Sequence, residues 1–465
     1  MVDKTSSYKD HVSTITEDGK GRKWMYPKLI KGKLYILRNI FAGALLTLLF
    51  AGPFIKVNGE QLILLNILER RFAFFGVIFV PQDFYLFVLG TLIFIVFIVL
   101  FTSLFGRVFC GWACPQTIFM EMVFRRIERW IEGDAKQQKK LDNGPMTTEK
   151  ILKKTSKHFL FLLISFLISN IFLSYIIGSD QLIQIITEPL AGHVTGFISI
   201  CIFTFVFYIV FSKIRELVCT MVCPYGRLQG VLLDSNSMIV AYDYVRGEPR
   251  GKRKREAEPD VIGDCVDCGL CVDVCPTGID IRNGTQMECI NCTLCIDACD
   301  MVMKKINRPK RLIGFFSDEH ITNRKQFTVG RRIYSYAALI LILSAILSFL
   351  ILRRTDIETT ILRASGTLYQ MRDDGTTVSN LYNAEFYNRT SQSIKFQVVP
   401  QGSGTQIQYI TKPEELKKGA SMKITFFIIQ DIKNIKSYKS DIKLQVLSAG
   451  KVLENIETTF IAPPN

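Results

Sequence analysis

The sequence predicts a multi-domain membrane protein with three kinds of fold: a five-helix α-helical transmembrane bundle, a small cysteine-rich α+β domain and an all-β C-terminal sandwich. Of the 465 residues, 48% are hydrophobic and 34 are Phe, which is too apolar for a soluble domain of ordinary composition. All 13 cysteines lie at or before Cys299. The chain from Thr355 onward has no cysteine and contains segments that alternate polar with apolar residues, as β-strands do.

Five apolar segments are long enough to cross a membrane, which takes about 20 residues of helix. They cover residues 35–54, 84–105, 158–178, 193–212 and 333–352. The first follows a long basic stretch and has no small-residue cleavage site, so we predict a retained helix rather than a signal peptide. Five crossings place the two ends of the chain on opposite sides of the membrane.

The distribution of Lys and Arg predicts the orientation. The loops after the second and fourth spans are rich in both residues, whereas residues 179–192 contain Asp180 and Glu188 but no Lys or Arg. Because cytoplasmic loops carry the basic excess, we predict a multi-pass protein of the cytoplasmic (inner) membrane, with a cytoplasmic N-terminus and everything after Leu352 outside, in the periplasm. The net charge of +15 then needs no nucleic acid, since the basic residues flank helices instead of forming one basic and aromatic surface.

The strongest motif is a pair of cysteine runs on the predicted cytoplasmic side, where disulfides are rare. Cys-x2-Cys-x2-Cys-x3-Cys-Pro begins at Cys265, and the same spacing begins at Cys289, with Asp300 in place of the proline. It resembles a bacterial two-cluster ferredoxin domain, in which the fourth Cys of each run binds the other cluster. A zinc site is disfavoured because no His accompanies the eight cysteines. The cross-over predicts one [4Fe-4S] cluster on Cys265, Cys268, Cys271 and Cys299, and a second on Cys275, Cys289, Cys292 and Cys295.

A second motif, Cys-x3-Cys-Pro, follows both the second and the fourth span, as Cys110 to Pro115 and Cys219 to Pro224. The two copies are separated by the same 109 residues as the spans before them (219 − 110 and 223 − 114), which indicates an internal repeat. Positions i and i+4 share one face of a helix, so each pair is expected to point both sulfurs in one direction. Symmetric packing would bring four thiolates together, and such soft ligands select Cu(I), zinc or iron–sulfur centres. The alternative is that these are small buried residues packing helix ends.

Alternating residues at 394–398, 406–409, 423–426 and 441–446 predict an antiparallel sandwich without a catalytic constellation, for which we expect a docking or assembly role. The chain therefore divides into a basic cytoplasmic N-terminal segment (1–34), a four-span membrane domain (35–230), a cytoplasmic two-cluster ferredoxin-like domain (255–310), a fifth transmembrane helix (333–352) and an exported sandwich (355–465).

This ordered combination resembles the CcoG family of cytochrome c oxidase accessory proteins, also called FixG or RdxA, over nearly the whole chain beyond its first 30 residues. The resemblance implies a polyferredoxin-type membrane protein with an immunoglobulin-like exported domain. It implies assembly of a cbb3-type cytochrome oxidase, with the oxidase or its copper chaperones as partners, by reduction of Cu(II) to Cu(I) for the oxidase copper site. The clusters would supply electrons, and the catalytic, copper-handling groups would be Cys110, Cys114, Cys219 and Cys223.

Two other functions stay open. The same motifs resemble NapH-type quinol-oxidising electron-transfer proteins, and reduction of the clusters by quinol in membranes without copper would favour that function. The protein could instead be a non-enzymatic copper-binding assembly scaffold, which clusters unable to change redox state without unfolding would favour. The sequence also leaves open whether the electron donor is a quinol or a soluble reductase, and whether the repeats pair within one chain or across a homodimer.

Overall fold

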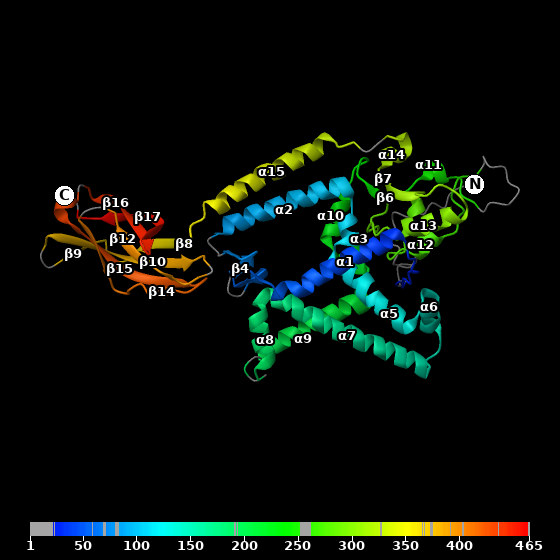
Figure 1. The fold of residues 1–465 in the computed structure, drawn as a ribbon, viewed down its shortest axis with the longest axis horizontal. Coiled ribbons are helices and arrows are strands. Elements are labelled where there is room, and N and C mark those ends of the chain that lie inside the picture. The colour runs from blue at the N-terminus through cyan, green and yellow to red at the C-terminus, as the bar shows by residue number, and fades with distance from the viewer. Residues whose placement is uncertain are drawn as a thin grey trace. The chain divides into compact units, whose positions relative to one another are not determined.

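The fold is described from a computed structural model, shown in Figure 1. It describes residues 22, 24–57, 59–67, 71–79, 83–189, 192, 194–251, 262–325, 328–364, 366, 368–372, 375–390, 392–401, 404–435 and 437–463. His193, where the predicted fourth span begins, lies outside them. The chain forms two compact units. The first contains the chain up to residue 51 with residues 89–173 and 183–345, and the second contains residues 52–88, 174–182 and 346–465.

Five helices of the described chain are long and apolar enough to cross a membrane, as predicted. They are α1 (Lys33–Ala51), α2 (Phe84–Phe105), α7 (Thr148–Ile177), α9 (Val194–Ile209) and α15 (Arg331–Leu352). Helix α7 begins ten residues before the predicted His158, because its polar first turns continue the helix beyond the apolar stretch. Helix α9 continues into a π-helical turn, η5 (Val210–Ile214).

The segment after the first Cys-x3-Cys-Pro motif forms a nearly continuous helix that packs against α7 and α9. It consists of α4 (Pro115–Ile118), the π-helical η3 (Phe119–Phe124) and α5 (Arg125–Glu132), and it is followed by α6 (Ala135–Asn143). The ring of Phe124 lies between those of Phe161 and Phe211, with centroid distances of 4.8 and 4.5 Å. These buried rings hold the two halves of the repeat on one apolar core.

The cysteine-rich domain is small and mixed α+β, as predicted. Its helices are α11 (Tyr244–Gly247), α12 (Leu270–Asp273), η7 (Ile281–Asn283), α13 (Leu294–Lys305) and α14 (Asp318–Asn323), and an antiparallel pair of strands, β6 (Ile239–Tyr242) and β7 (Ile313–Phe316), flanks them. The core formed by Val240, Ile281, Ile296 and Met303 joins the strands to the helices.

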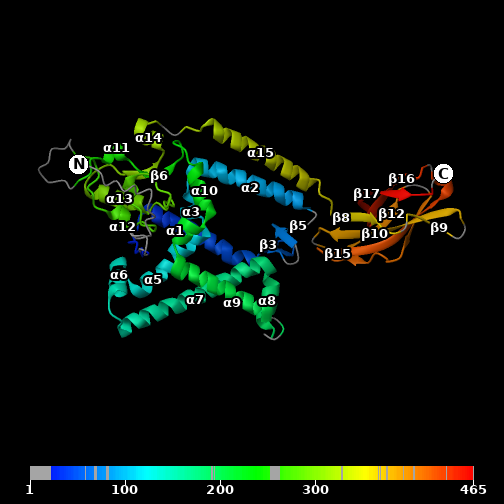
Figure 2. The ribbon, with the colours of Figure 1, turned by 180° about the vertical axis from the view of Figure 1, so that it is seen from behind.

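A carboxylate from this domain caps the first membrane helix. Asp297, in α13, accepts hydrogen bonds from the backbone N–H groups of Leu34 (3.2 Å) and Tyr35 (2.7 Å), at the start of α1. Figure 2 shows the beginning of α1 beside α12 and α13. These N–H groups have no partner within the helix, so the cap stabilises α1 and fixes the domain to it. Gly32 fits beside the carboxylate because it has no Cβ.

The second unit includes structure that the sequence did not predict. Between the first two spans lie η1 (Gly52–Phe54) and five strands, β1 (Lys56–Val57), β2 (Glu60–Gln61), β3 (Ile63–Asn66), β4 (Arg71–Phe74) and β5 (Val77–Phe79). Residues 179–192, expected to be a loop, contain the helix α8 (Ser179–Thr187). The side chain of Gln61 donates to the carbonyl of Ser174 (3.1 Å) and accepts from the N–H of Ser179 (3.1 Å), which joins β2 to the end of α7.

The C-terminal region is the predicted antiparallel sandwich. One sheet has the order β13-β15-β10-β8 with β9 beside β10, a second has the order β12-β16-β17, and β11 pairs with β14. The fully buried side chains of Tyr382, Phe386, Phe426 and Phe460 fill the space between the sheets. The strands are β8 (Ile357–Arg363), β9 (Gln370–Met371), β10 (Thr377–Asn388), β11 (Ile394–Lys395), β12 (Gln397–Pro400), β13 (Thr405–Tyr409), β14 (Glu415–Leu416), β15 (Ser421–Asp431), β16 (Lys439–Ser448) and β17 (Lys451–Ile461), and η8 (Ile432–Asn434) follows β15.

Asp83, directly before α2, joins this sandwich to the membrane edge of the same unit. Its carboxylate is buried and pairs with Arg354, which follows α15, and with Arg389 (2.7 Å), which follows β10. Lys418 also pairs with Glu60 (2.9 Å) in β2. A buried carboxylate between two guanidinium groups favours one geometry, because losing either partner would leave a charge uncompensated.

Replacing Gly32 by Ala should destabilise the protein by roughly 1–3 kcal/mol, because the new Cβ would overlap the Asp297 carboxylate. Gly43→Ala is the matched control: it lies within α1, and a Cβ there meets no atom within 4 Å. Thermal unfolding in detergent would measure both. Asp297→Ala should cost about 1 kcal/mol through the lost cap. The double variant should cost less than the sum of the two single variants, because truncation removes the carboxyl atoms that the new Cβ overlaps and leaves only the Cβ of residue 297 close to it. Equal stability of the Gly32 and Gly43 variants would contradict this account.

Candidate metal centres

The structure brings the eight cysteines of the ferredoxin-like domain together in two groups. One cavity is lined by Cys265, Cys268, Cys271 and Cys299. A second is lined by Cys275, Cys289, Cys292 and Cys295, and Cys271 lines it as well. We call these the first and second cysteine groups. The grouping follows the spacing, and iron binding by individual residues stays a prediction.

Matching left-handed turns shape both runs. Asp267 and Asn291, each two residues after the first cysteine, have φ near +50°, and Gly269 and Thr293, two residues further on, both have φ of +67°. These turns wrap the chain around each cavity before α12 and α13 begin. A positive φ is costly for a β-branched residue such as Thr293, and such strain is concentrated at functional sites.

The donor atoms fit iron–sulfur clusters. Burial raises the pKa of the Cys271, Cys289 and Cys299 thiols to about 12, so these sulfurs are neutral until a metal displaces their protons. Among the described residues, no three His, Cys, Asp or Glu side chains converge as they would around a single metal ion. A tetrahedral zinc ion needs such convergence, with sulfurs about 2.3 Å away. A cubane spreads its four thiolates over four irons, so more widely spaced donors suit it.

The two Cys-x3-Cys-Pro motifs have matching backbones. Cys110 lies in α3 (Val108–Trp112) and Cys219 in the π-helical η6 (Val218–Val222). Cys114 and Cys223 are extended, and each precedes the proline that begins a helix, α4 or α10 (Pro224–Leu232). The N–H of Cys114 donates to the carbonyl of Phe109 (2.9 Å), and that of Cys223 donates to Val218 (2.8 Å). In both copies the bond reaches five residues back, as the internal repeat predicts.

One expectation about these pairs was wrong. The two cysteines of a pair do not share the face of one helix, because the helix ends before the second of them. The physical reason is the following proline, which disfavours helical backbone at the residue before it. The repeat extends further back, since Gly106 and Arg215 precede the two motifs at equivalent positions and both have φ of +56°.

The fold nevertheless places these four cysteines close enough to interact electrostatically, although no three of them converge as around a single metal ion. We call Cys110, Cys114, Cys219 and Cys223 the thiol set. The Cys110 thiol donates to Oε1 of Gln229 (3.0 Å) in α10, across the repeat. Burial raises the pKa of Cys110 and Cys219 to about 12. Other thiols of the set raise both values further, and the charge of Arg107 opposes the shift at Cys110. Burial also raises the pKa of Cys114, although N–H groups at the start of α4 oppose that shift.

The thiol set lies against the second cysteine group. A Cβ on Gly111, between Cys110 and Cys114, would overlap the carbonyl oxygen of Ile290 and stand 2.9 Å from that of Asn291. Cys110 packs in the same apolar cluster as Cys292. On the other side of the set, Cys219 lines a cavity together with Pro276 and Thr277, which follow Cys275.

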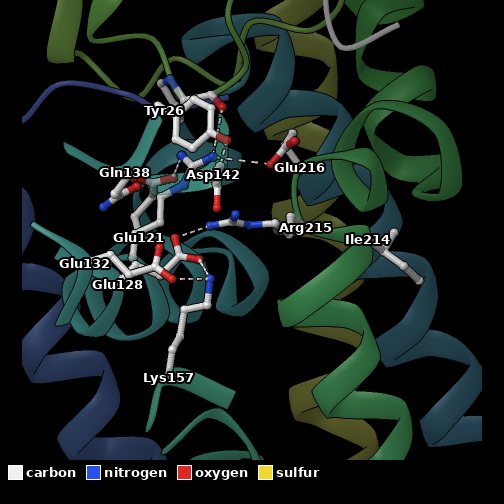
Figure 3. Close-up of polar contacts among 12 residues, drawn as sticks. Tyr26, Glu121, Glu128, Glu132, Gln138, Asp142, Lys157, Ile214, Arg215 and Glu216 are labelled. Carbon is white, nitrogen blue, oxygen red and sulfur yellow. Dashed lines mark hydrogen bonds and ion pairs between the residues drawn. The ribbon is translucent and has the colours of Figure 1, made fainter. Parts of the chain in front are cut away.

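A buried ionic network holds the turn before the second motif. Arg215 pairs with Glu128 of α5, and Lys157 of α7 reaches Glu128 (3.6 Å) and Glu132 (2.9 Å), as Figure 3 shows. Burial opposes ionisation of Glu128, but the charges of Arg215 and Lys157 hold its pKa below the ordinary value. The network holds Arg215 at its positive φ. In the first copy of the repeat the equivalent residue is Gly106, which adopts a positive φ without such support.

Sequence reasoning missed this network because it counted Arg and Lys only as markers of the cytoplasmic side. The available signal was the helical spacing of Glu121, Arg125, Glu128 and Glu132, which places opposite charges on one helix face. Next to it, Arg125 pairs with Glu121 and with Glu216 (3.3 Å), the residue after Arg215. Arg125 also donates to the carbonyl of Pro276 (3.2 Å), so the network touches the second cysteine group.

Models of protein families match three parts of the chain. A 4Fe-4S dicluster domain matches residues 214–318, and a 4Fe-4S binding domain matches residues 87–133. An IG-like fold at the C-terminal of FixG, putative oxidoreductase, matches residues 347–463. These matches support iron–sulfur clusters as cofactors and an immunoglobulin-like fold for the tail.

Three curated relatives cover much of the chain. Nitrogen fixation protein FixG of Rhizobium meliloti (strain 1021) is 38% identical over 302 residues, which are 63% of this chain and 57% of that one. Protein RdxA of Cereibacter sphaeroides is 37% identical over 356 residues, or 74% of each chain. Protein RdxB of the same organism is 35% identical over 398 residues, or 81% of this chain and 82% of that one.

Among solved structures, a FixG-related protein from Vibrio parahaemolyticus aligns with 23% of this chain and 97% of its own. The sequence identity is 16% and the TM-score is 0.20, too low to carry an argument.

Proposed function

The chain belongs to the family of FixG and RdxA, and on that premise we propose that it reduces Cu(II) to Cu(I) during assembly of a cbb3-type cytochrome oxidase. It is an iron–sulfur electron-transfer protein with helices suited to a membrane. One observation carries the proposal: the loop between Cys110 and Cys114 packs directly on the backbone of Ile290 and Asn291, which lie between Cys289 and Cys292 of the second cysteine group. Soft sulfur ligands therefore stand beside a predicted electron source.

We assign one [4Fe-4S] cluster to each cysteine group, and the lining of the two cavities supports this assignment. Bound clusters supply single electrons at low potential. The chain's residues hold both groups in one small domain and bury three of the eight cysteines, Cys265, Cys271 and Cys292.

Replacing Cys275 by Ser should remove the cluster of the second group and leave that of the first more nearly intact, because the fourth cysteine of the first run reaches across. Iron analysis and EPR of the reduced protein would show the loss. Cys201→Ser is the control, since Cys201 is exposed in α9 and belongs to neither group nor to the thiol set. Loss confined to the first cluster would refute the assignment.

In this proposal the thiol set binds copper as substrate. Reduction of Cu(II) takes one electron and no proton, which agrees with the lack of a predicted acid–base constellation. Thiolates bind Cu(I) better than Cu(II), so they favour the reduced product. Because the pKa of Cys110 and Cys219 is raised to about 12, copper must displace their protons, and binding should weaken as the pH falls.

The double variant Cys110→Ser/Cys114→Ser should keep both clusters but lose Cu(II) reduction, since it removes soft ligands and no predicted cluster ligand. The double variant Cys219→Ser/Cys223→Ser should behave in the same way. A Cu(I) chelator assay with EPR of the clusters would measure both properties. Groups that act as one unit are not additive, so each double variant should be about as impaired as the quadruple variant. Full copper reduction by the quadruple variant would refute the proposal, and the four cysteines would then have only a packing role.

A second occupant of the thiol set is an iron–sulfur cluster. The match of residues 87–133 to a 4Fe-4S binding domain favours it, because Cys110 and Cys114 are the cysteines in that range. Iron analysis separates the two occupants. Two cubanes give about 8 irons per chain, whereas a third gives about 12, and the quadruple Ser variant would then lose about 4.

We also propose that the N-terminus and the ferredoxin-like domain lie in the cytoplasm and the sandwich outside, where it would dock the oxidase or a copper chaperone. The Lys and Arg asymmetry supports this orientation. The thiol set would then lie at the cytoplasmic membrane edge and serve copper on its way out of the cell.

A tag after the sandwich should be removed by protease added to spheroplasts, whereas a tag at the N-terminus should be protected until the membrane is permeabilised. The reverse pattern would overturn both the orientation and the docking role of the sandwich. It would leave the cluster assignment untouched.

A further inference from the structure

Two buried arginines lack the carboxylate that such residues normally need. Arg38 and Arg107 are only 2% and 5% exposed, and neither has a carboxylate partner within the described parts of the chain. The other two buried arginines of the first unit, Arg125 and Arg215, pair with Glu side chains. An isolated buried charge is costly unless something compensates it, so the surroundings of Arg38 and Arg107 call for an anion.

Both guanidinium groups lie where the thiol set meets the second cysteine group. Arg38, from α1, donates through Nε to the carbonyl of Gly111 (2.8 Å), and its buried Nη2 has no partner. Arg107 donates to the carbonyls of Met287, Cys289 (3.4 Å) and Gly226. It also reaches Gln229 (3.4 Å), the acceptor of the Cys110 thiol.

The charges of the two arginines reach the cysteines of the second group. Arg107 donates to the carbonyl of Cys289 (3.4 Å), and Arg38 holds Gly111, which packs on the backbone of Ile290 and Asn291, just before Cys292. Glu121 lines a cavity together with Arg38, but Glu121 pairs with Arg125, which offsets its charge.

The first group has different surroundings. Its nearby cation, Arg282, is paired with Asp280 (2.7 Å) and with Asp267. Asp300 directly follows Cys299 and pairs with Arg311 (3.6 Å). Within the described residues, the arginines beside the second group thus form no ion pair with a carboxylate, whereas Arg282 beside the first group forms two.

We propose that Arg38 and Arg107 are positioning residues for electron transfer, which make the second cluster easier to reduce than the first. A [4Fe-4S] cluster with four thiolates is anionic, and one-electron reduction adds a further negative charge. A buried cation stabilises that state strongly because the interior screens charge poorly. One electron leaves the first centre and reduces the second, toward the thiol set, and no bond or proton changes place. The inference rests on the cluster assignment proposed above and not on copper.

The test is an EPR-monitored redox titration of the full-length protein with both clusters bound. Arg107→Gln removes the charge but keeps an amide donor, whereas Arg107→Lys keeps the charge but loses the fork of donors. At a fixed potential, the Gln variant should lower the ratio of reduced to oxidised second cluster about tenfold, which is 59 mV for a one-electron couple. The Lys variant should stay within about threefold of the parent, and the first cluster should not change. Arg38→Gln and Arg38→Lys should differ in the same way.

Arg126→Gln is the control, because Arg126 of α5 makes an exposed hydrogen bond to Asn39, the residue next to Arg38 in α1. Unchanged ratios in the two Gln variants, with iron content intact, would overturn the proposal. Equal shifts of both clusters would overturn it too. If Arg107→Gln loses iron, the potentials of the Arg38 variants test the proposal instead. If both Gln variants lose iron, the arginines serve only to hold the cysteine loops in place and the proposal is overturned. Failure of copper reduction with these potentials intact would refute the proposed function alone.

Discussion

The close packing of Gly111 on the carbonyl groups of Ile290 and Asn291 is the contact on which the candidate site depends. Any side chain at Gly111 would have to push the loop of the ferredoxin-like domain away from the membrane helices. The contact places the thiol set beside the second cysteine group, and two further interactions hold the same junction. Asp297 caps α1 from within the ferredoxin-like domain, and Arg107 joins α10 to the loop that contains Cys289. Membrane helices and cysteine loops therefore form one site.

The internal repeat shows how one backbone geometry can have two different supports. Before the first motif, Gly106 adopts a positive φ without steric cost. Before the second, Arg215 adopts the same φ, and its guanidinium is held by Glu128 and stacks on the ring of Trp24 at 4.6 Å. The first turn is thus stable locally, whereas the second depends on partners from α5 and from the N-terminal segment. The buried ionic network supports the thiol set without being part of it.

The charges around the cysteines favour electron transfer in one direction. In the proposed assignment two buried arginines that form no ion pair among the described residues lie beside the second group, a paired arginine lies beside the first group, and the thiol set adjoins the second. An electron would move toward positive charge and toward the ligands that favour Cu(I). The family matches support the iron–sulfur chemistry. The proposed order of electron transfer, from the first group to the second and then to the thiol set, is based on packing. The sandwich lies in the other unit, with its own core, and contributes no side chain to these contacts among the described residues.

The sequence by itself determined the features that depend on local patterns. Apolar length determined the five spans, alternation determined the sandwich, and cysteine spacing determined which cysteines share a cavity, because each pattern lies within a short stretch of chain. The tertiary structure alone decided which distant residues meet, such as Asp297 with the start of α1, Gly111 with Ile290, and Arg38 with Gly111. Arg38 and Arg107 stand in basic stretches like any membrane-flanking arginine, and only packing buries them. Burial without a partner carboxylate changes their physical role, since a charge inside the protein is screened less than in water and acts more strongly on its neighbours.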